Sequence, residues 1–274
     1  MQIFNSWENI RRKKPLIHHI TNYVTVNDVA NVTLACGASP IMADDLGEVA
    51  EITALAQGLC LNIGTLNQRT IPAMLKAAQK ADELNHPIVL DPVGAGATVL
   101  RTKTAHDILQ AVPITCVRGN ISEIKALVKG SGNTQGVDAA PADRISTENL
   151  TTACTFAKQA AAMLKTTIAI TGAIDLVADQ NICYVIRNGR PEMSRVTGTG
   201  CQCSAITAAC IAANPDEPLA AAATAVMAMG LAGELAYENL RPKEGNATYR
   251  NRIIDTLCRL TADDLKKGAK YEIR

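Results

Sequence analysis

The chain has 274 residues, of which 47% are hydrophobic and 19% are charged, and its formal net charge is +1. This composition is typical of a folded globular protein and excludes a disordered chain. A net charge so close to zero gives no electrostatic reason to expect nucleic acid or an anionic membrane as a partner. The N-terminal segment lacks an apolar signal core, and the alanine-rich run 218–233 is too short for a membrane span. We therefore expect a cytoplasmic protein that binds neither nucleic acid nor membrane.

The spacing of the nine cysteines argues against a disulfide scaffold and against a zinc site. Their number is odd, and the one close pair, Cys201 and Cys203, has no second Cys or His pair at zinc-finger spacing. Most of the others lie in apolar surroundings, where a free cysteine behaves as a small hydrophobic residue. Cys201 differs, because we expect it at the start of a helix, where the helix dipole lowers the pKa of a thiol.

Taken in chain order, short apolar runs alternate with longer helical patterns over the first two thirds of the sequence. The runs predict strands at 16–20, 40–42, 59–63, 88–91, 114–117 and 167–171, and the patterns predict helices at 27–36, 47–57, 71–84, 105–111, 121–128 and 147–164. Such alternation implies β-α-β crossovers, hence an α/β fold with a largely parallel central sheet and helices on both faces. Residues 129–146, rich in Gly, Ser, Asn and Pro, are expected to form a surface loop.

The pattern then changes once. Residues 173–178 and 182–186 flank the turn sequence Asp179-Gln-Asn181, which predicts a β-hairpin that adds an antiparallel edge to the sheet. After it we expect only helices, at 201–213, 219–239 and 246–260. Because no linker or change of composition divides the chain, residues 1–274 are predicted to form a single domain.

The segment Val196-Thr-Gly-Thr-Gly-Cys201 leads directly into an uncharged, alanine-rich run. This pattern predicts a tight loop that opens into the first turn of a buried helix. Gly198 and Gly200 allow the backbone to approach a ligand closely, and the free N–H groups and positive dipole end of the helix favour an anion. The side chain of Cys201 would lie beside whatever is bound.

Glycine and polar residues also follow several of the predicted strands. These clusters are Ile63-Gly-Thr65, Asp91-Pro-Val-Gly-Ala-Gly96, Arg118-Gly-Asn120 with Glu123, and Thr171-Gly172. Ligands of parallel sheets bind in the crevice at the carboxyl ends of the strands. We therefore expect these clusters and the Gly198–Gly200 loop to meet in one site.

The residue types in these clusters fit phosphoryl transfer, which depends on positioning and charge neutralisation. Asp91 and Glu123 are predicted to hold a hydrated Mg²⁺, since magnesium takes one or two carboxylates together with water and phosphates. Arg118 is placed to contact a phosphate with its planar guanidinium, and Thr171 to offer its hydroxyl to another phosphate oxygen. Simpler roles stay open at this point: Asp91 bonding its own turn, Glu123 capping a helix and Arg118 forming a surface salt bridge.

Five motifs in order make the chain resemble the hydroxyethylthiazole kinase family of thiamine salvage, in the ribokinase-like superfamily. They are His18-His-Ile-Thr-Asn-Tyr-Val24, Ser39-Pro-Ile-Met-Ala43, Leu90-Asp-Pro-Val-Gly-Ala-Gly96, Arg118-Gly-Asn-Ile-Ser-Glu123 and Val196-Thr-Gly-Thr-Gly-Cys201. The resemblance covers essentially the whole length. It implies a ribokinase-like fold, ATP as co-substrate, Mg²⁺ as cofactor and the hydroxyl of 4-methyl-5-(2-hydroxyethyl)thiazole as phosphoryl acceptor.

The resemblance also implies roles for single residues. Met42 and Gly198 would contact the thiazole alcohol, and Arg118 and Thr171 would contact ATP. Members of the family resemble homotrimers with sites at subunit interfaces, so the substrate-binding residue Asn22 and its neighbours to Thr25 are expected to serve a neighbouring site. The chain departs from the family pattern at Gln202-Cys203, where smaller or purely apolar residues are expected.

Cys201 occupies the position at which the superfamily usually carries an aspartate as base for the acceptor hydroxyl. The sequence leaves open whether Cys201 positions the hydroxyl or accepts its proton. Three other functions stay open as well. They are an ATP-dependent hydro-lyase of the same superfamily, a cysteine hydrolase with His18 or His19 as base, and a non-catalytic sensor of thiazole or nucleotide.

Overall fold

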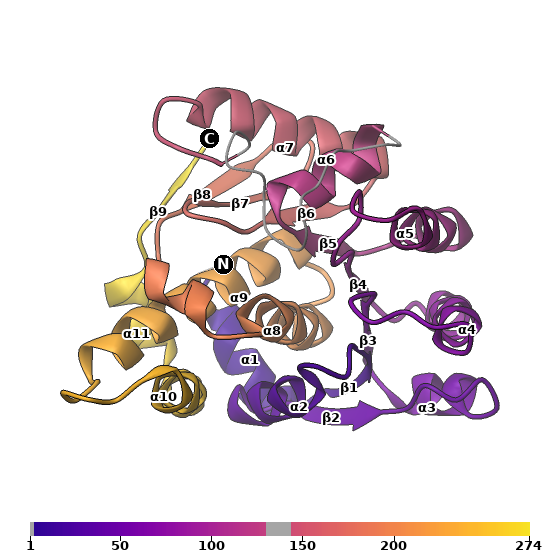
Figure 1. Ribbon diagram of the computed structural model, residues 1–274, viewed down its shortest axis with the longest axis horizontal. Coiled ribbons are helices and arrows are strands. Elements are labelled where there is room, and N and C mark those ends of the chain that lie inside the picture. The colour runs from indigo at the N-terminus through magenta and orange to yellow at the C-terminus, as the bar shows by residue number, and fades with distance from the viewer. Residues whose placement is uncertain (1–2, 130–143) are drawn as a thin grey trace.

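The computed structural model describes residues 3–129 and 144–274, and within these ranges the strands form one nine-stranded sheet (Figure 1). The strands are β1 Leu16–Ile20, β2 Ser39–Met42, β3 Gly58–Asn62, β4 Ile88–Asp91, β5 Cys116–Gly119, β6 Thr167–Ile170, β7 Asp175–Ala178, β8 Cys183–Ile186 and β9 Tyr271–Ile273. Their order across the sheet is β2-β1-β3-β4-β5-β6-β7-β8-β9. From β2 to β6 all neighbours pair in parallel, and from β6 to β9 they pair antiparallel. The predicted parallel sheet with an antiparallel hairpin is confirmed.

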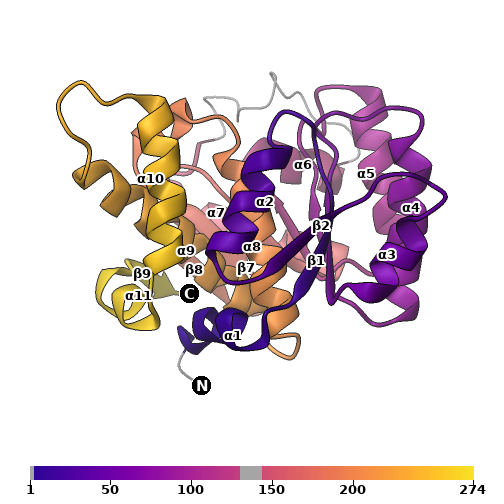
Figure 2. The ribbon, with the colours of Figure 1, turned by 90° about the horizontal axis from the view of Figure 1, so that it is seen from below.

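Helices cover both faces of this sheet (Figures 1 and 2). One face carries α3 Val49–Leu55, α4 Thr70–Glu83, α5 Val99–Ala111, α6 Ile121–Lys129 and α7 Leu150–Leu164. The other carries α1 Asn5–Lys13, α2 Val26–Ala35, α8 Thr199–Ala213, α9 Pro218–Glu238, α10 Asn246–Arg259 and α11 Ala262–Gly268. A short 3-10 helix, η2 Pro191–Arg195, precedes the glycine loop.

Each face of the sheet packs its own hydrophobic core. On the α3–α7 side, leucine and isoleucine side chains of the strands meet a row of buried alanines in α4, among them Ala73 and Ala77. On the opposite side, α8 and α9 are buried along almost their whole length. By length and composition α9 passes as a membrane span, but 83% of its most apolar window is buried inside the protein, so here it acts as a core helix.

Four described elements were not predicted from the sequence, namely η2, β9, α1 and α11. The expectation that only helices follow the glycine loop is wrong, because Tyr271–Ile273 forms β9 and pairs antiparallel with β8. A three-residue strand is too short for alternating hydrophobicity to show. Helix α1 buries Trp7 and Ile10, and α11 begins with a capping box in which Thr261 and Asp264 bond each other's backbone N–H.

Several predicted boundaries were also displaced by more than one residue, most of them by two or three residues. Helix α5 begins six residues before the predicted position, because the Thr98 side chain caps it by accepting a hydrogen bond from the N–H of Arg101. Strand β5 lies two residues later than predicted, so that Arg118 belongs to the strand itself. Most of the predicted surface loop, 130–143, lies outside the described residues.

Candidate functional site

The carboxyl ends of the parallel strands bring the predicted polar residues to one edge of the sheet. The register pairs Asn62, the last residue of β3, with Asp91, the last residue of β4. Arg118 lies next along the sheet on β5, and the residue after β6 is Thr171. The first turn of α8 lies against the same edge, because Gly200 approaches the Arg118 side chain. This edge is therefore the meeting point that the sequence predicted.

The loop before α8 depends on glycine at two positions for different reasons. Gly198 is the N-cap of α8 with φ 88°, a left-handed conformation that other residues rarely adopt, and a Cβ there would lie 2.5 Å from Cγ2 of Thr25. At Gly200 the backbone is helical, but a Cβ would lie 2.8 Å from Nη1 of Arg118. The second glycine thus lets the guanidinium lie directly against the free N–H groups of the helix start.

Arg118 is buried and does not form a surface salt bridge. Its Nη1 lies 3.5 Å from Oδ2 of Asp91, and its Nη2 donates to the hydroxyl of Thr171. The same Asp91 oxygen accepts hydrogen bonds from Ser204 Oγ at 2.7 Å and Asn62 Nδ2 at 2.9 Å. Asp91 is therefore held by three other elements rather than by its own turn.

The second oxygen of Asp91 has no such partner. Asp91 is fully buried, and within residues 3–129 and 144–274 its Oδ1 makes no hydrogen bond. Burial raises the pKa of this carboxyl, while the positive charge of Arg118 acts in the opposite direction. A buried carboxylate oxygen without a donor is suited to a cation or to ordered water.

Glu123 caps α6, as the simpler reading of the sequence suggested. Its Oε2 accepts the N–H of Asn120 at 2.7 Å, while the Asn120 side chain accepts the N–H of Glu123 at 2.8 Å. Its Oε1 accepts the N–H of Gly94 at 2.8 Å, which ties the loop after β4 to α6. Burial, with a contribution from the charge of Asp91, raises the pKa of Glu123 to about 7.

Cys201 lies at the start of α8 and is half-buried. Its Sγ is 3.2 Å from Nδ2 of Asn22 and 3.3 Å from Nδ2 of Asn62. The expectation of a lowered thiol pKa is wrong: burial, followed by the charge of Asp91, raises the pKa of Cys201. Removal from water and a nearby carboxylate outweigh the amide donors and the helix dipole here.

Asn22 is buried beside Cys201 of its own chain. Its Oδ1 accepts hydrogen bonds from the backbone and hydroxyl of Thr25. Tyr23 and Val24, between them, are 77% and 61% exposed. Asn22 and Thr25 thus belong to the hydrogen-bond network around Cys201 of the same chain, and a role of this segment in a neighbouring site stays a prediction.

Met42, expected to contact the acceptor, lies at the end of the edge strand β2. It is half-buried and packs against the core on the α8 side, outside the hydrogen-bond network of Asp91 and Cys201. Two members of that network, Asn62 and Ser204, were not predicted. Asn62 carried a signal, since it is a polar residue that interrupts the apolar run 59–63, whereas Ser204 lies within a uniformly small-residue helix.

The two histidines of β1 point to opposite faces of the sheet, and each bonds a threonine of a neighbouring helix. His18 bonds Thr53 Oγ1 at 2.9 Å and the carbonyl of Ala43 at 2.8 Å, and burial lowers its pKa. His19 bonds Thr33 Oγ1 at 3.2 Å, and burial lowers its pKa to about 3. Among the described residues neither ring hydrogen-bonds Cys201, whose own thiol pKa is raised, so the structure gives no support to a cysteine hydrolase.

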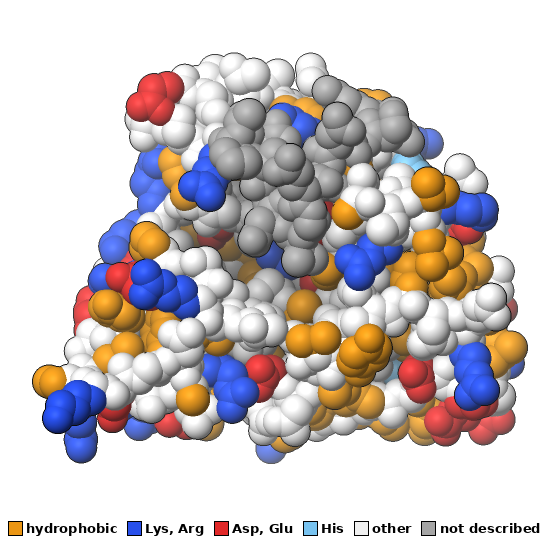
Figure 3. All heavy atoms as spheres, in the orientation of Figure 1, with side chains coloured by type: hydrophobic (Ala, Val, Ile, Leu, Met, Phe, Trp, Pro, Cys, Tyr) orange, Lys and Arg blue, Asp and Glu red, His pale blue; other side chains and the backbone are white. Residues whose placement is uncertain are grey.

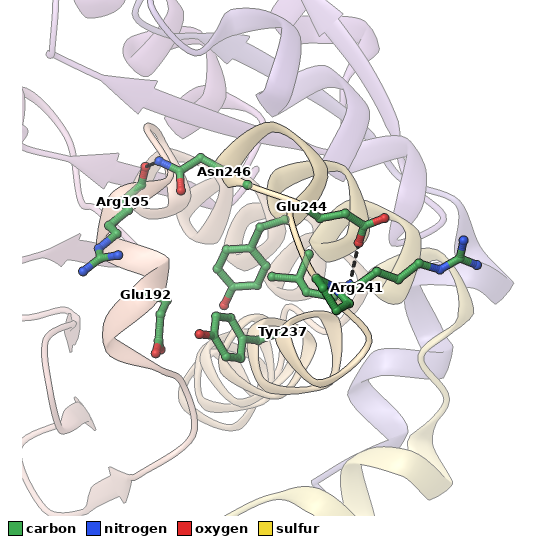
Figure 4. A pocket seen from close by; sticks show the side chains of 10 residues that line it. Glu192, Arg195, Tyr237, Arg241, Glu244 and Asn246 are labelled. Atoms are coloured by element: carbon green, nitrogen blue, oxygen red, sulfur yellow. Dashed lines mark hydrogen bonds between the residues drawn. The ribbon is translucent and has the colours of Figure 1, made fainter.

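A separate pocket of about 460 Å³ opens beyond η2 (Figure 4). Glu192 lies on η2 opposite Tyr237 of α9, while the guanidinium of Arg195, also on η2, points away from Tyr237 (Figure 4). The residues that line it are Glu192, Arg195, Tyr237, Leu240, Arg241, Pro242, Glu244, Gly245, Asn246 and Tyr249. None of the predicted site residues is among them, although Arg195 precedes Gly198 by only three positions.

Exposed hydrophobic side chains gather near the site. Besides Tyr23 and Val24, they include Val99 and Leu100 at the start of α5, which are 85% and 51% exposed. Arg101 connects the two groups, because its Nη2 donates to the carbonyl of Gly64, and the next residue, Thr65, accepts the N–H of Tyr23. Figure 3 shows hydrophobic side chains exposed in the region of α5. Exposed apolar groups of this kind mark interaction surfaces.

Comparison with known proteins agrees with this geometry. Residues 7–263 match the hydroxyethylthiazole kinase family. The chain is 56% identical to a hydroxyethylthiazole kinase of Clostridium acetobutylicum, with 97% of each chain covered. A solved hydroxyethylthiazole kinase from Pyrococcus horikoshii superposes with a TM-score of 0.88 and 36% identity, covering 99% of this chain and 98% of that one. A ribokinase-like protein from Enterococcus faecalis, 12% identical with a TM-score of 0.61 over 93% and 89%, shares the fold. The chain belongs to the hydroxyethylthiazole kinase family.

Proposed function

We propose that this protein transfers the γ-phosphoryl group of ATP to the hydroxyl of 4-methyl-5-(2-hydroxyethyl)thiazole. In this reaction the hydroxyl oxygen forms a bond to the γ-phosphorus, the bond to the bridging β–γ oxygen breaks and ADP leaves, while the hydroxyl proton passes by way of the transferred phosphoryl group to water. One observation carries the proposal for this member of the family. The buried guanidinium of Arg118 lies against Gly200, at the end of α8 where the backbone N–H groups are free. Two sources of positive charge converge there, as a transferring phosphoryl group requires.

Arg118 and Thr171 support the assignment to ATP. The guanidinium is buried, and its Nε has no hydrogen-bond partner among the described residues. Asp91 and Thr171 fix the remaining nitrogens, so that the positive charge is preorganised before substrate arrives. The N–H groups that follow Gly198 face the same region and suit the oxygens of a phosphate.

The residues present fit a magnesium ion. Asp91 offers the unpartnered Oδ1, and Glu123 is held at the same edge of the sheet by its capping bonds. Among the described residues no three His, Cys, Asp or Glu side chains group closely enough to bind a metal ion, so phosphate oxygens and water would complete the coordination. Bound by Asp91 and Glu123, Mg²⁺ would neutralise charge on the β- and γ-phosphates.

Cys201 is assigned to position the acceptor hydroxyl rather than to remove its proton. The raised pKa keeps the side chain a neutral thiol at neutral pH, and a thiol is a poor base. A loose phosphoryl-transfer transition state needs little early deprotonation, so a positioned hydroxyl is sufficient. Met42 and Gly198 are proposed to contact the thiazole alcohol.

The functional unit is proposed to be a homotrimer of single-domain chains, residues 1–274, acting in the cytoplasm. The exposed pairs Tyr23–Val24 and Val99–Leu100 beside the site support an interface between copies of the chain. Because Arg118 and Asn22 both lie near Cys201 of one chain, mixed oligomers of Arg118→Ala and Asn22→Ala subunits should be no more active than the average of the two variants. Activity restored in demonstrably mixed oligomers would show that the two residues act in different sites.

The test is incubation with Mg-ATP and a panel of small heterocyclic alcohols, with ADP and phosphorylated product both quantified. We expect one ADP per phosphorylated thiazole alcohol. Dehydration of a substrate without a phosphorylated alcohol would favour the hydro-lyase. Tight binding of nucleotide and thiazole without any turnover would favour a sensor.

A further inference from the structure

The side-chain amide of Asn62 is a buried polar group for which phosphoryl transfer has so far required no role. Asn62 is 2% exposed, and its Oδ1 accepts hydrogen bonds from the N–H of Gly64 and from Nδ2 of Asn22, each at 3.0 Å. A backbone N–H can only donate, so this contact fixes the orientation of the amide. The Nδ2 group must therefore face Asp91 and Cys201, at 2.9 and 3.3 Å.

The amide of Asn22 is fixed in the same way. Its Oδ1 accepts the N–H of Thr25 at 3.1 Å and the hydroxyl of Thr25 at 3.0 Å. Its Nδ2 then faces the sulfur of Cys201 at 3.2 Å. Asn22 makes no hydrogen bond to Asp91, so any influence on the reaction through these contacts runs by way of the sulfur or of Asn62.

Two N–H donors with fixed orientations thus converge on one sulfur atom. A thiol sulfur is a weak acceptor, and a cysteine side chain in the first turn of a helix has more than one rotamer available. Two donors aimed at the same point select the rotamer that places the sulfur between them. A chain of hydrogen bonds from Thr25 through Asn22 and Asn62 to Asp91 joins this sulfur to the carboxylate of the site.

We propose that Asn62, together with Asn22, is a positioning residue for phosphoryl transfer, and that the two amides hold the sulfur of Cys201 where it meets the acceptor hydroxyl. This inference rests on the proposed function. Neither amide needs to touch the substrate, since both act through the thiol. A misplaced hydroxyl lowers turnover more than binding, because alignment with the phosphorus is required only for reaction.

A double-mutant cycle tests the route. Asn62→Ser and Asn22→Ser are each made in the wild-type chain and in a Cys201→Ala background. In the wild type we expect each change to lower kcat about tenfold, with the KM values for ATP and thiazole alcohol little changed. In the Cys201→Ala background the further loss should fall within about twofold. A loss that persists in full there would overturn the proposal and show that Asn62 acts through Asp91.

Ser204→Ala is the matched control, because it removes a hydrogen bond to the same Asp91 oxygen without contacting the sulfur. Its effect on kcat should be the same in both backgrounds. A crystal structure of the Asn22→Ser, Asn62→Ser double variant gives a readout that needs no activity. We expect the Cys201 side chain in more than one rotamer, and a single unchanged rotamer would overturn the proposal. Absence of any phosphorylated product from the wild type would instead overturn the proposed function.

Discussion

Gly200→Ala separates the chemistry of the site from the stability of the fold. The new Cβ would lie 2.8 Å from Nη1 and 3.0 Å from Nη2 of Arg118. To reach an ordinary contact of 3.4 Å, the guanidinium must retreat by about 0.6 Å, the difference between 3.4 and 2.8 Å. The backbone at Gly200 is helical, so alanine fits the conformation without strain. The end of an arginine side chain gives way at little cost in free energy.

We therefore expect unchanged or slightly raised thermal stability together with a kcat about tenfold lower, because the charge that meets the phosphate has moved. Gly245→Ala is the control, since a Cβ at this helix N-cap meets nothing within 4 Å, and its turnover should match the wild type. Steady-state kinetics and thermal melts of the three proteins decide the matter. If Gly200→Ala keeps kcat and the KM for ATP within about twofold of wild type, the guanidinium against α8 does not position the phosphate.

Four further outcomes follow from the same contacts. Cys201→Asp should keep or raise kcat, because a carboxylate is a better base than a thiol. Cys201→Ala should lower kcat without abolishing it. Full activity of Cys201→Ala together with loss of activity in Cys201→Asp would show that Cys201 serves only in packing. Glu123→Gln should lower kcat far more than binding of the thiazole alcohol, and wild-type turnover at limiting Mg²⁺ would contradict a metal role. Gln202→Leu should raise the free energy of unfolding by about 1–3 kcal/mol, because both polar atoms of this buried side chain lack hydrogen-bond partners among the described residues. Urea denaturation measures this free energy. A destabilised variant would indicate that a bound water hydrogen-bonds the Gln202 amide. Burial raises the pKa of Asp175 to about 7, so ionisation of this carboxyl costs the folded state nothing below its usual pKa and an increasing amount as the pH rises toward 7. Asp175→Asn should therefore have a higher free energy of unfolding than the wild type at pH 8 but not at pH 4. An equal difference at the two pH values would refute the shift.

The parallel sheet could be predicted because its strands are short apolar runs separated by helical patterns. Strand β4, Ile88–Asp91, was predicted at its observed bounds, since a fully buried strand is a continuous apolar run. Strand β9 could not be predicted, because three residues are too few to show an alternation of hydrophobic and polar side chains. It forms only by pairing with β8, which lies far away in the sequence. The early start of α5 depends on the Thr98 cap, a local contact that the helical pattern alone does not reveal.

The site could be predicted to the level of its strand ends but not to the level of its hydrogen bonds. Asp91, Arg118 and Thr171 each follow or end an apolar run, and the topology of a parallel sheet then brings them together. The partners of Cys201 could not be predicted, because Asn22 and Asn62 reach its sulfur from loops and strands that are 179 and 139 residues away in the chain. Burial of Cys201 and the charge of Asp91 raise its pKa and outweigh the hydrogen bond from Asn22, which is why the helix dipole alone gave the wrong direction.

The central claim is that the hydroxyl oxygen of the thiazole alcohol attacks the γ-phosphorus of ATP at this site. The most direct measurement uses acceptor labelled with ¹⁸O in the hydroxyl, together with Mg-ATP and the purified protein, followed by mass spectrometry of the products. We predict that the label stays in the phosphate ester and that one ADP forms for each labelled ester. Loss of the label from the thiazole product, or ADP formed with inorganic phosphate and unchanged alcohol, would contradict the proposed reaction.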